Sequence, residues 1–190
     1  PEAVLSIGVP QRPVLIISPV HSLWSKADEQ TWNEITQSWG WLCQNVWNLG
    51  YDFDIVTETD FAASEFDKRS RSLYANEKFY RVILLPSCAS LQEATVSRLT
   101  AVLKGRGKLI TVESVPYLLN GKMGLDTHPL ELLLYHRRTS ILRGTVDEKI
   151  DVLKRLLEKW VKPVLRIYVK PDNTPTGVIR LHHRRAEGLD

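Results

Sequence analysis

Two mainly apolar runs flank an amphipathic segment between residues 81 and 114, and this unit constrains the fold more than any other part of the chain. Residues 81–86 (RVILLP) and 108–112 (KLITV) lack the strict polar/apolar alternation of a half-exposed strand. We therefore predict a central parallel strand at 81–86 and the next strand of the sheet at 108–112. Between them, Ser90-x-x-Glu93 has capping-box spacing and Gly105 marks an end, which predicts a helix. A strand, a helix and a strand in this order form a parallel unit with a right-handed crossover.

The same order recurs in the first third of the chain. Residues 13–19 predict a buried first strand, and residues 51–57 predict a second. The segment between them predicts a helix that ends at Gly50. Its N-terminal cap is either Thr31-x-x-Glu34, or Ser25 or Asp28 one turn earlier. The apolar positions follow a 3-4 spacing along one helix face: Trp32, Ile35, Trp39, Leu42, Val46 and Leu49.

The remaining segments up to residue 162 extend this pattern. Residues 58–71 predict a short helix and a loop, residues 72–74 a short edge strand, and residues 140–143 a further strand. Residues 116–136 predict a loop-rich insertion with a Leu-rich helix at 130–134. Thr145-x-x-Glu148 predicts the start of a last helix, whose apolar face is Val146, Ile150, Leu153, Leu157 and Trp160. Together these elements predict an α/β fold, a flavodoxin-like open parallel sheet with helices on both faces.

After Pro163 the pattern changes to alternation. Residues 164–169 and 177–182 alternate around a turn at 171–175, which predicts a C-terminal β-hairpin. The hairpin is either the start of a neighbouring β-rich domain or an antiparallel addition to this one. We therefore divide the chain into an α/β domain at 1–162 and a hairpin at 163–190, and expect both ends to continue into a longer protein.

Composition and motifs argue against several functional classes. No run of about 18 apolar residues exists, so no membrane span is expected. The net charge of +3 is too small to indicate a nucleic-acid partner. Cys43 and Cys88 form no CxxC, which argues against a thiolate metal site. Gly105-Arg-Gly107 leads from a helix into a strand, the reverse of a phosphate-binding turn. We expect neither a metal nor a cofactor.

Cys88 is the candidate for nucleophilic chemistry. It follows a predicted central strand and precedes a helix, at the sheet edge where open α/β sheets bind ligands. A helix N-terminus also lowers the pKa of a thiol. Its flanks, Pro86-Ser-Cys-Ala-Ser90, contain no glycine for the sharp turn of a nucleophile elbow, and no base is evident. A structural cysteine is the favoured interpretation, and catalysis by Cys88 is the alternative.

His21 and Trp24 are the candidates for substrate binding. They follow the first predicted strand, in a loop at the same edge of the sheet, where an aromatic ring can stack on a sugar. The alternative is that they cover the Trp-rich helix. The basic cluster His182-His183-Arg184-Arg185 has three open interpretations: an anion or metal site, a solvated strand end, or a segment that docks on a further domain. Adjacent strand residues face opposite ways, so the two histidines cannot easily bind one metal, and the last interpretation is favoured.

Several of these segments resemble one family. Residues 79–86, the helix that follows, residues 105–110 and residues 116–121 resemble the glutamine-amidotransferase-like (class I) domain of multidomain glycoside hydrolases. Large α-L-rhamnosidase-type enzymes are the nearer likeness, and the trimerisation domain of β-galactosidases the more distant one. Residues 19–24 and 50–54 are similar to the same domain, and residues 178–184 to the strand that leads into its next β-sandwich.

The resemblance implies a function without chemistry in this chain. The catalytic carboxylates of those enzymes usually lie in a separate barrel domain. Active amidotransferases need a cysteine between glycines and a His-x-Glu pair, and this chain has neither. The resemblance therefore implies a non-catalytic accessory domain of a carbohydrate-active enzyme. Its expected partners are neighbouring domains of the same chain, carbohydrate or a second copy. A Cys-dependent amidohydrolase using Cys88, and an interaction module using the Trp-rich helix, remain the alternatives.

Overall fold

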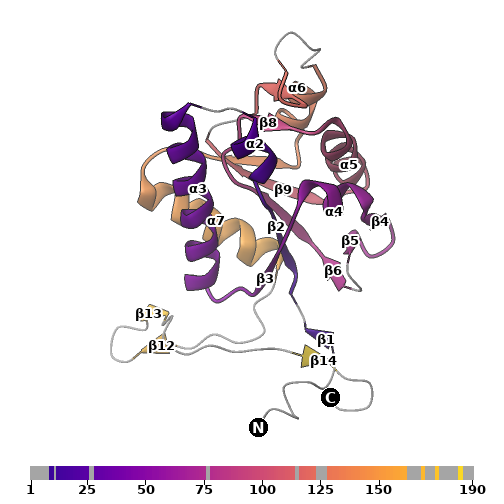
Figure 1. Cartoon of the computed structure of the whole chain (residues 1–190). Helices are drawn as coiled ribbons and strands as arrows, with labels where there is room; N and C mark the ends of the chain where they lie inside the picture. Colours follow the sequence, from indigo (N-terminus) through magenta and orange to yellow (C-terminus); the bar gives the residue numbers. More distant parts are fainter. Residues whose placement is uncertain are drawn as a thin grey trace.

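A five-stranded parallel sheet forms the centre of the protein (Figure 1). The computed structural model describes residues 12–25, 28–75, 78–113, 116–122 and 128–161, and the backbone of 9–10, 168–169, 174–175 and 184–185. The sheet order is β11-β9-β7-β2-β3. In chain order these are the fifth, fourth, third, first and second strands, which is the flavodoxin-like arrangement. The strands are β2 (Val14–Ile17), β3 (Phe53–Val56), β7 (Val82–Leu85), β9 (Lys108–Val112) and β11 (Thr139–Leu142). The predicted fold class is confirmed.

Helices cover both faces of this sheet (Figure 1). Helices α3 (Glu29–Asn48) and α7 (Val146–Trp160) lie on one face. Helices α4 (Glu58–Ala63), α5 (Glu93–Lys104) and α6 (His128–Leu134) lie on the other. The strands serve both cores, because Val14 and Ile16 of β2 pack toward α3 and α7 while Leu15 and Ile17 pack toward α5. All four have no exposed surface, which explains why their run is apolar without alternation.

The sequence left the N-cap residue of α3 undecided and predicted a capping box for α7. Asp28 is the N-cap of α3, and its Oδ1 accepts a hydrogen bond from Thr31 N at 2.7 Å. Of the three alternatives, Asp28 is therefore the cap, and neither Ser25 nor Thr31 is. Thr145 and Glu148 form the predicted capping box of α7. Leu153 and Leu157 are fully buried as expected, whereas Val146 is 54% exposed and contributes little to the core.

The predicted Ser90 cap of α5 is wrong. Ser90 belongs to a two-residue strand, β8 (Ser90–Leu91), and its Oγ accepts from Gly121 N instead. Gln92 occupies the N-cap position without a side-chain cap. The first N–H groups of the helix are accepted by Glu58 Oε2 and Asn120 Oδ1, which are distant in sequence. A capping-box spacing cannot reveal that such long-range acceptors take its place.

A three-stranded antiparallel sheet lies between β3 and β7 in the chain. It consists of β4 (Glu65–Asp67), β5 (Ser72–Ala75) and β6 (Lys78–Tyr80). Only β5 was expected, and it joins this small sheet rather than the edge of the main one. Asp54 of β3 accepts hydrogen bonds from Lys78 Nζ (3.1 Å), Tyr80 Oη (2.9 Å) and Arg12, and these ties connect the two sheets. Burial raises the pKa of Asp54, but the three donors outweigh burial and hold it below its usual range.

Three further strand pairs are short. Strand β10 (Leu118–Leu119) runs parallel to β8. Strands β12 (Tyr168–Val169) and β13 (Thr174–Pro175) pair antiparallel, so a hairpin forms earlier than predicted, with residues 174–175 in a strand rather than in the turn. The predicted second arm, residues 177–182, lies outside the described residues, and the boundary at 162/163 stays a prediction. Strand β14 (Arg184–Arg185) pairs with β1 (Val9–Pro10).

Helices α3 and α5 end in the same hydrogen-bonded motif with different residues. In α3, Gly50 N donates to Trp47 O and Tyr51 N to Val46 O, and Gly50 has φ +83°. This is a Schellman ending with glycine in the left-handed position. In α5, Arg106 N donates to Leu103 O, and Gly107 N to Val102 O. Here the left-handed residue is Arg106, at φ +77°. The predicted helix end in Gly105-Arg-Gly107 is therefore confirmed, but neither glycine adopts its left-handed conformation.

The two glycines serve packing instead. A Cβ on Gly105 would lie 2.2 Å from Phe66 Cε1, and one on Gly107 would lie 2.3 Å from Val102 Cγ1. The Phe66 ring of β4 thus rests on this turn. A non-glycine residue in the left-handed region costs about 1–2 kcal/mol.

We therefore predict that Arg106→Gly increases the free energy of unfolding by about 1 kcal/mol. The variant removes the backbone strain of the folded state, but the greater freedom of glycine in the unfolded chain offsets part of this gain. The measurement is urea unfolding followed by far-UV circular dichroism. The reciprocal variant, Gly50→Arg, is expected to destabilise by a similar amount, because nothing lies within 4 Å of its new Cβ and only the backbone is affected. A destabilised Arg106→Gly protein would contradict this account.

Candidate functional site

The topological switch point of the sheet lies between β2 and β7. These strands are neighbours, and the chain leaves β2 toward α3 on one face and leaves β7 toward α5 on the other. In open α/β sheets the crevice at the carboxyl ends of such strands is the usual ligand site. Here it is bordered by α2 (Val20–Trp24) and by residues 86–92. The structure thus brings His21, Trp24 and Cys88 to one edge, although the first two lie in a short helix and not in the predicted loop.

The crevice is occupied by the protein's own side chains. Ser22 of α2 is fully buried, and its Oγ accepts hydrogen bonds from Ala89 N (2.7 Å) and Ser90 N (3.1 Å). Two further N–H groups of this loop are satisfied from elsewhere: Ser87 N donates to Ser38 Oγ at 2.9 Å, and Gln92 N donates to Glu58 Oε2 at 2.8 Å. The N–H groups that would face an anionic ligand therefore already have acceptors.

Ser22 is predicted to be a key stabilising residue of this edge. Ser22→Ala leaves two buried N–H groups without an acceptor, and each unsatisfied group costs about 1–3 kcal/mol. We expect a loss of about 2–4 kcal/mol in the free energy of unfolding, measured by urea denaturation. Ser97→Ala, an exposed position in α5, is the matched control and is expected to change stability by less than about 0.5 kcal/mol. A Ser22→Ala protein as stable as this control would show that the loop finds other acceptors.

Cys88 has the environment of a structural thiol. Its side chain is 1% exposed, and burial, followed by the nearby charge of Glu58, raises its pKa well above the usual range. Among the described residues, no histidine forms a hydrogen bond with its sulfur. The N–H of the residue after a nucleophile normally contributes to an oxyanion hole. That group belongs to Ala89 and is held by Ser22. Cys43, the other free cysteine, lies in α3 and packs against the opposite core.

A small polar cluster lies beneath α2. Glu58 is 1% exposed, and Oε1, its second carboxylate oxygen, accepts no hydrogen bond of regular geometry within the described part of the chain. Burial raises the pKa of Glu58, and the Gln92 N–H, the Thr95 hydroxyl and His21 offset this in part. The Gln92 amide nitrogen in turn lies 3.1 Å from His21 Nε2 and 3.3 Å from Nδ1. The cluster thus links α2, α4 and α5 across the edge.

The raised pKa of Glu58 predicts a pH-dependent stability. A folded-state pKa above the unfolded value means that stability is full at low pH and decreases as pH rises through the folded pKa. Glu58→Gln keeps an acceptor for Gln92 N without the buried charge. We expect this variant to melt above the wild type at pH 8, and the difference to vanish by about pH 4. Glu131→Gln, which removes an exposed carboxyl on α6, is the control. Parallel melting profiles for Glu58→Gln and wild type would contradict a penalised buried charge.

Aromatic side chains remain accessible above this filled crevice. Trp24 is 75% exposed, and its ring makes an edge-to-face contact with His21 at a centroid distance of 5.9 Å. Tyr117 is 58% exposed and lies on the neighbouring loop, where its N–H donates to Ala89 O at 3.0 Å. Gly121 brings the same loop against α2, since a Cβ there would lie 3.3 Å from Ser25 Cβ. The carboxyl edge therefore exposes Trp24 and Tyr117 over a hydrogen-bonded base.

The sequence identified some of these residues and missed others. It identified His21, Trp24 and Cys88 by their place after predicted strands. Ser22, Glu58 and Tyr117 were missed. Placement directly after a strand was a usable signal for Glu58, which follows β3. No sequence pattern indicates that Ser22 accepts two backbone hydrogen bonds or that Tyr117 is exposed. Trp39 and Trp41 are half-buried against the α3 and α7 core, so the Trp-rich helix uses part of its aromatic surface for packing.

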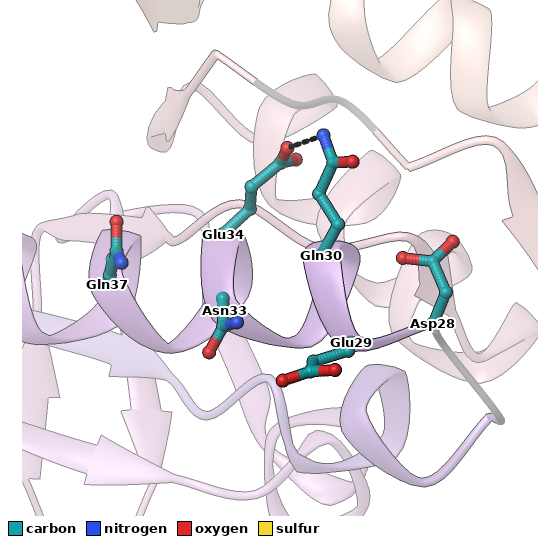
Figure 2. A pocket seen from close by; sticks show the side chains of 6 residues that line it. All are labelled: Asp28, Glu29, Gln30, Asn33, Glu34 and Gln37. Carbon is teal, nitrogen blue, oxygen red and sulfur yellow. Dashed lines mark hydrogen bonds between the residues drawn. The ribbon is translucent and has the colours of Figure 1, made fainter.

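A second, shallow hollow lies on the first turns of α3 (Figure 2). Its lining is polar: Asp28, Glu29, Gln30, Asn33, Glu34 and Gln37. Gln30 Nε2 donates to Glu34 Oε1 at 3.0 Å, while Glu29 and Asn33 project from another side of the helix (Figure 2). Because all six residues come from α3 and its N-cap, the hollow has a single wall and encloses no ligand.

Within the described ranges, no three His, Cys, Asp or Glu side chains are grouped so as to hold a metal ion. No helix in the described part combines the length and apolarity needed to span a membrane.

Comparison with known proteins gives one structural likeness. No protein-family model matches the chain, and no curated protein matches it. The fold is similar to part of the apo exo-carrageenase GH42 from Bacteroides ovatus, with a TM-score of 0.50 and 12% sequence identity. The likeness covers 78% of this chain and 18% of that one. This chain therefore has the fold of one segment of a much longer glycoside hydrolase.

Proposed function

We propose that this chain is a non-catalytic accessory α/β domain of a carbohydrate-active enzyme. The observation that carries the proposal is the likeness to 18% of a GH42 glycoside hydrolase. At 12% identity this likeness concerns the fold alone, so the role itself is inferred. The switch-point crevice supports a non-catalytic role, because Ser22 and Glu58 occupy the N–H groups that chemistry at this edge would need.

Under this proposal the carboxyl edge contributes an aromatic surface to a sugar pocket. A pyranose ring offers an apolar face that stacks on aromatic rings, while its hydroxyls bond to polar neighbours. Trp24 supplies the exposed ring, and His21 contacts it edge to face. Tyr117 supplies a second aromatic side chain at the same edge. This arrangement needs no cofactor and no metal.

The proposed partners are neighbouring domains of the same chain or a second copy of it. The edge strand β3 supports such packing, because it pairs on one side only within the five-stranded sheet and exposes 47% of Ile55. An apolar residue on an open strand edge favours association with another surface.

The alternative function, an amidohydrolase using Cys88, is disfavoured by the site. A buried thiol with a raised pKa has little thiolate at neutral pH, and the thiolate is the nucleophile. Release of ammonia from glutamine by the wild type, abolished in Cys88→Ala, would establish this alternative against our proposal.

The sugar-pocket role predicts a loss of binding in Trp24→Ala. We expect titration calorimetry to detect binding of neutral galacto- or rhamno-oligosaccharides to the wild type, and the variant to bind about tenfold more weakly, since an aromatic contact of about 1.4 kcal/mol corresponds to that factor. Trp47→Ala, 37% exposed at the far end of α3, is the control. Hydrolysis of nitrophenyl α-L-rhamnoside or β-galactoside by this chain alone would overturn the accessory role.

A further inference from the structure

A cluster of cations lies at the amino edge of the sheet, opposite the proposed sugar surface. It comprises Arg71, Arg106, Lys108, Arg137, Arg138 and Lys159, which we name the amino-edge cluster. These residues come from four places in the chain: the β4–β5 turn, the α5–β9 connection with the start of β9, the α6–β11 connection, and the last turn of α7. A net charge of +3 for the whole chain conceals this concentration.

Several contacts bring the four places together. Leu109 N donates to Arg138 O at 3.2 Å, and Arg138 Nη1 donates to Leu103 O at 3.3 Å, so this arginine joins β9, β11 and the end of α5. The Phe66 ring packs on Gly105, which holds the antiparallel sheet against the Arg106 turn. Lys108 Nζ lies 5.1 Å from the centre of the Trp160 ring, beside Lys159.

The six cations of the amino-edge cluster are not paired with carboxylates in the described part of the chain. Burial lowers the pKa of Lys108, and the charges of Arg138, Lys159, Arg137 and Arg71 lower it further. Asp67, the acidic residue before the β4–β5 turn, accepts instead from the backbone N–H groups of Arg69 and Ser70. Such a field attracts an anion to this edge.

Two of the arginines occupy strained backbone positions. Arg71 has φ +56° and Arg106 has φ +77°, where glycine or asparagine is favourable. Strain of this kind at residues with exposed charges suggests a function for those side chains. A binding role explains why arginine stands at both places.

We propose that the amino-edge cluster binds the sulfate groups of an acidic polysaccharide. Four of the six members are arginines, whose planar, weakly hydrated guanidinium groups form paired hydrogen bonds with oxyanions. Tyr135, in the same connection as Arg137 and Arg138, is 86% exposed and provides a ring for stacking on a sugar. The choice of a polysaccharide over nucleic acid rests on the proposed function. The surface lies at the edge opposite Trp24, so the two regions of binding are separable.

The test uses dextran sulfate, with neutral dextran of matched length as the comparison ligand. We expect titration calorimetry to detect binding of the sulfated polymer only, and the affinity to fall at least tenfold between 50 and 200 mM salt, because charges on the surface are screened. The double variant Arg71→Gly/Arg106→Gly should bind at least tenfold more weakly while its melting temperature rises. Lost binding in a stabilised protein cannot result from misfolding.

The matched control is Lys122→Gln/Arg143→Gln, which removes the same charge from exposed positions at the carboxyl edge. We expect this control variant to bind dextran sulfate with an affinity within twofold of the wild type. The proposal is overturned if the wild type does not bind dextran sulfate, if the control loses as much affinity as the double variant, or if polygalacturonate or a DNA duplex binds equally well. Trp24→Ala should leave dextran sulfate binding unchanged, so failure of the sugar-pocket proposal and failure of this one give different results.

Discussion

The loop that leaves β7 buries its backbone, and its N–H groups need acceptors inside the protein. Leaving one buried N–H group unsatisfied lowers the free energy of unfolding by about 1–3 kcal/mol, which is similar to the loss of a helix cap. Ser22, Ser38 and Glu58 meet this need from α2, α3 and α4. Their hydrogen bonds fix α2 over the switch point and join both helical layers to the central strand. The order of the carboxyl edge, including the positions of Trp24 and Tyr117, depends on these bonds.

The main sheet was predictable because its physical signal is local. Runs such as residues 82–85 are apolar without alternation, since both faces are buried by helices. Chain order and the handedness of crossovers then restrict the topology to few arrangements. The β4-β5-β6 sheet was largely missed because its strands are only three or four residues long, and part of its attachment is a set of side-chain bonds to Asp54. Cross-chain bonds of this kind have no sequence period.

The candidate site was predictable in position but not in character. Residues after parallel strands must meet at one edge, which was enough to select His21, Trp24 and Cys88. Whether that edge is open or filled depends on Ser22, a residue with no distinctive sequence context. The same limit applies to α5, where Ser90 has the spacing of a cap and yet bonds Gly121. At the amino edge, the left-handed conformation of Arg106 could not be predicted, because the two adjacent glycines adopt that conformation more readily than arginine does.

Ser22 also competes with ligands, because its hydroxyl already binds the N–H groups that a ligand in the crevice would use. Any ligand that uses the N–H groups of Ala89 and Ser90 must first displace α2, so only the displaced fraction of molecules can bind it. If displacement costs about 3 kcal/mol, that fraction is on the order of one in a hundred, and the apparent affinity falls by the same factor. Shortening this side chain by one oxygen atom would therefore trade folding stability for a larger ligand-accessible population. Helix α2 thus contributes to the stability of the domain and lowers the affinity of its switch point for ligands.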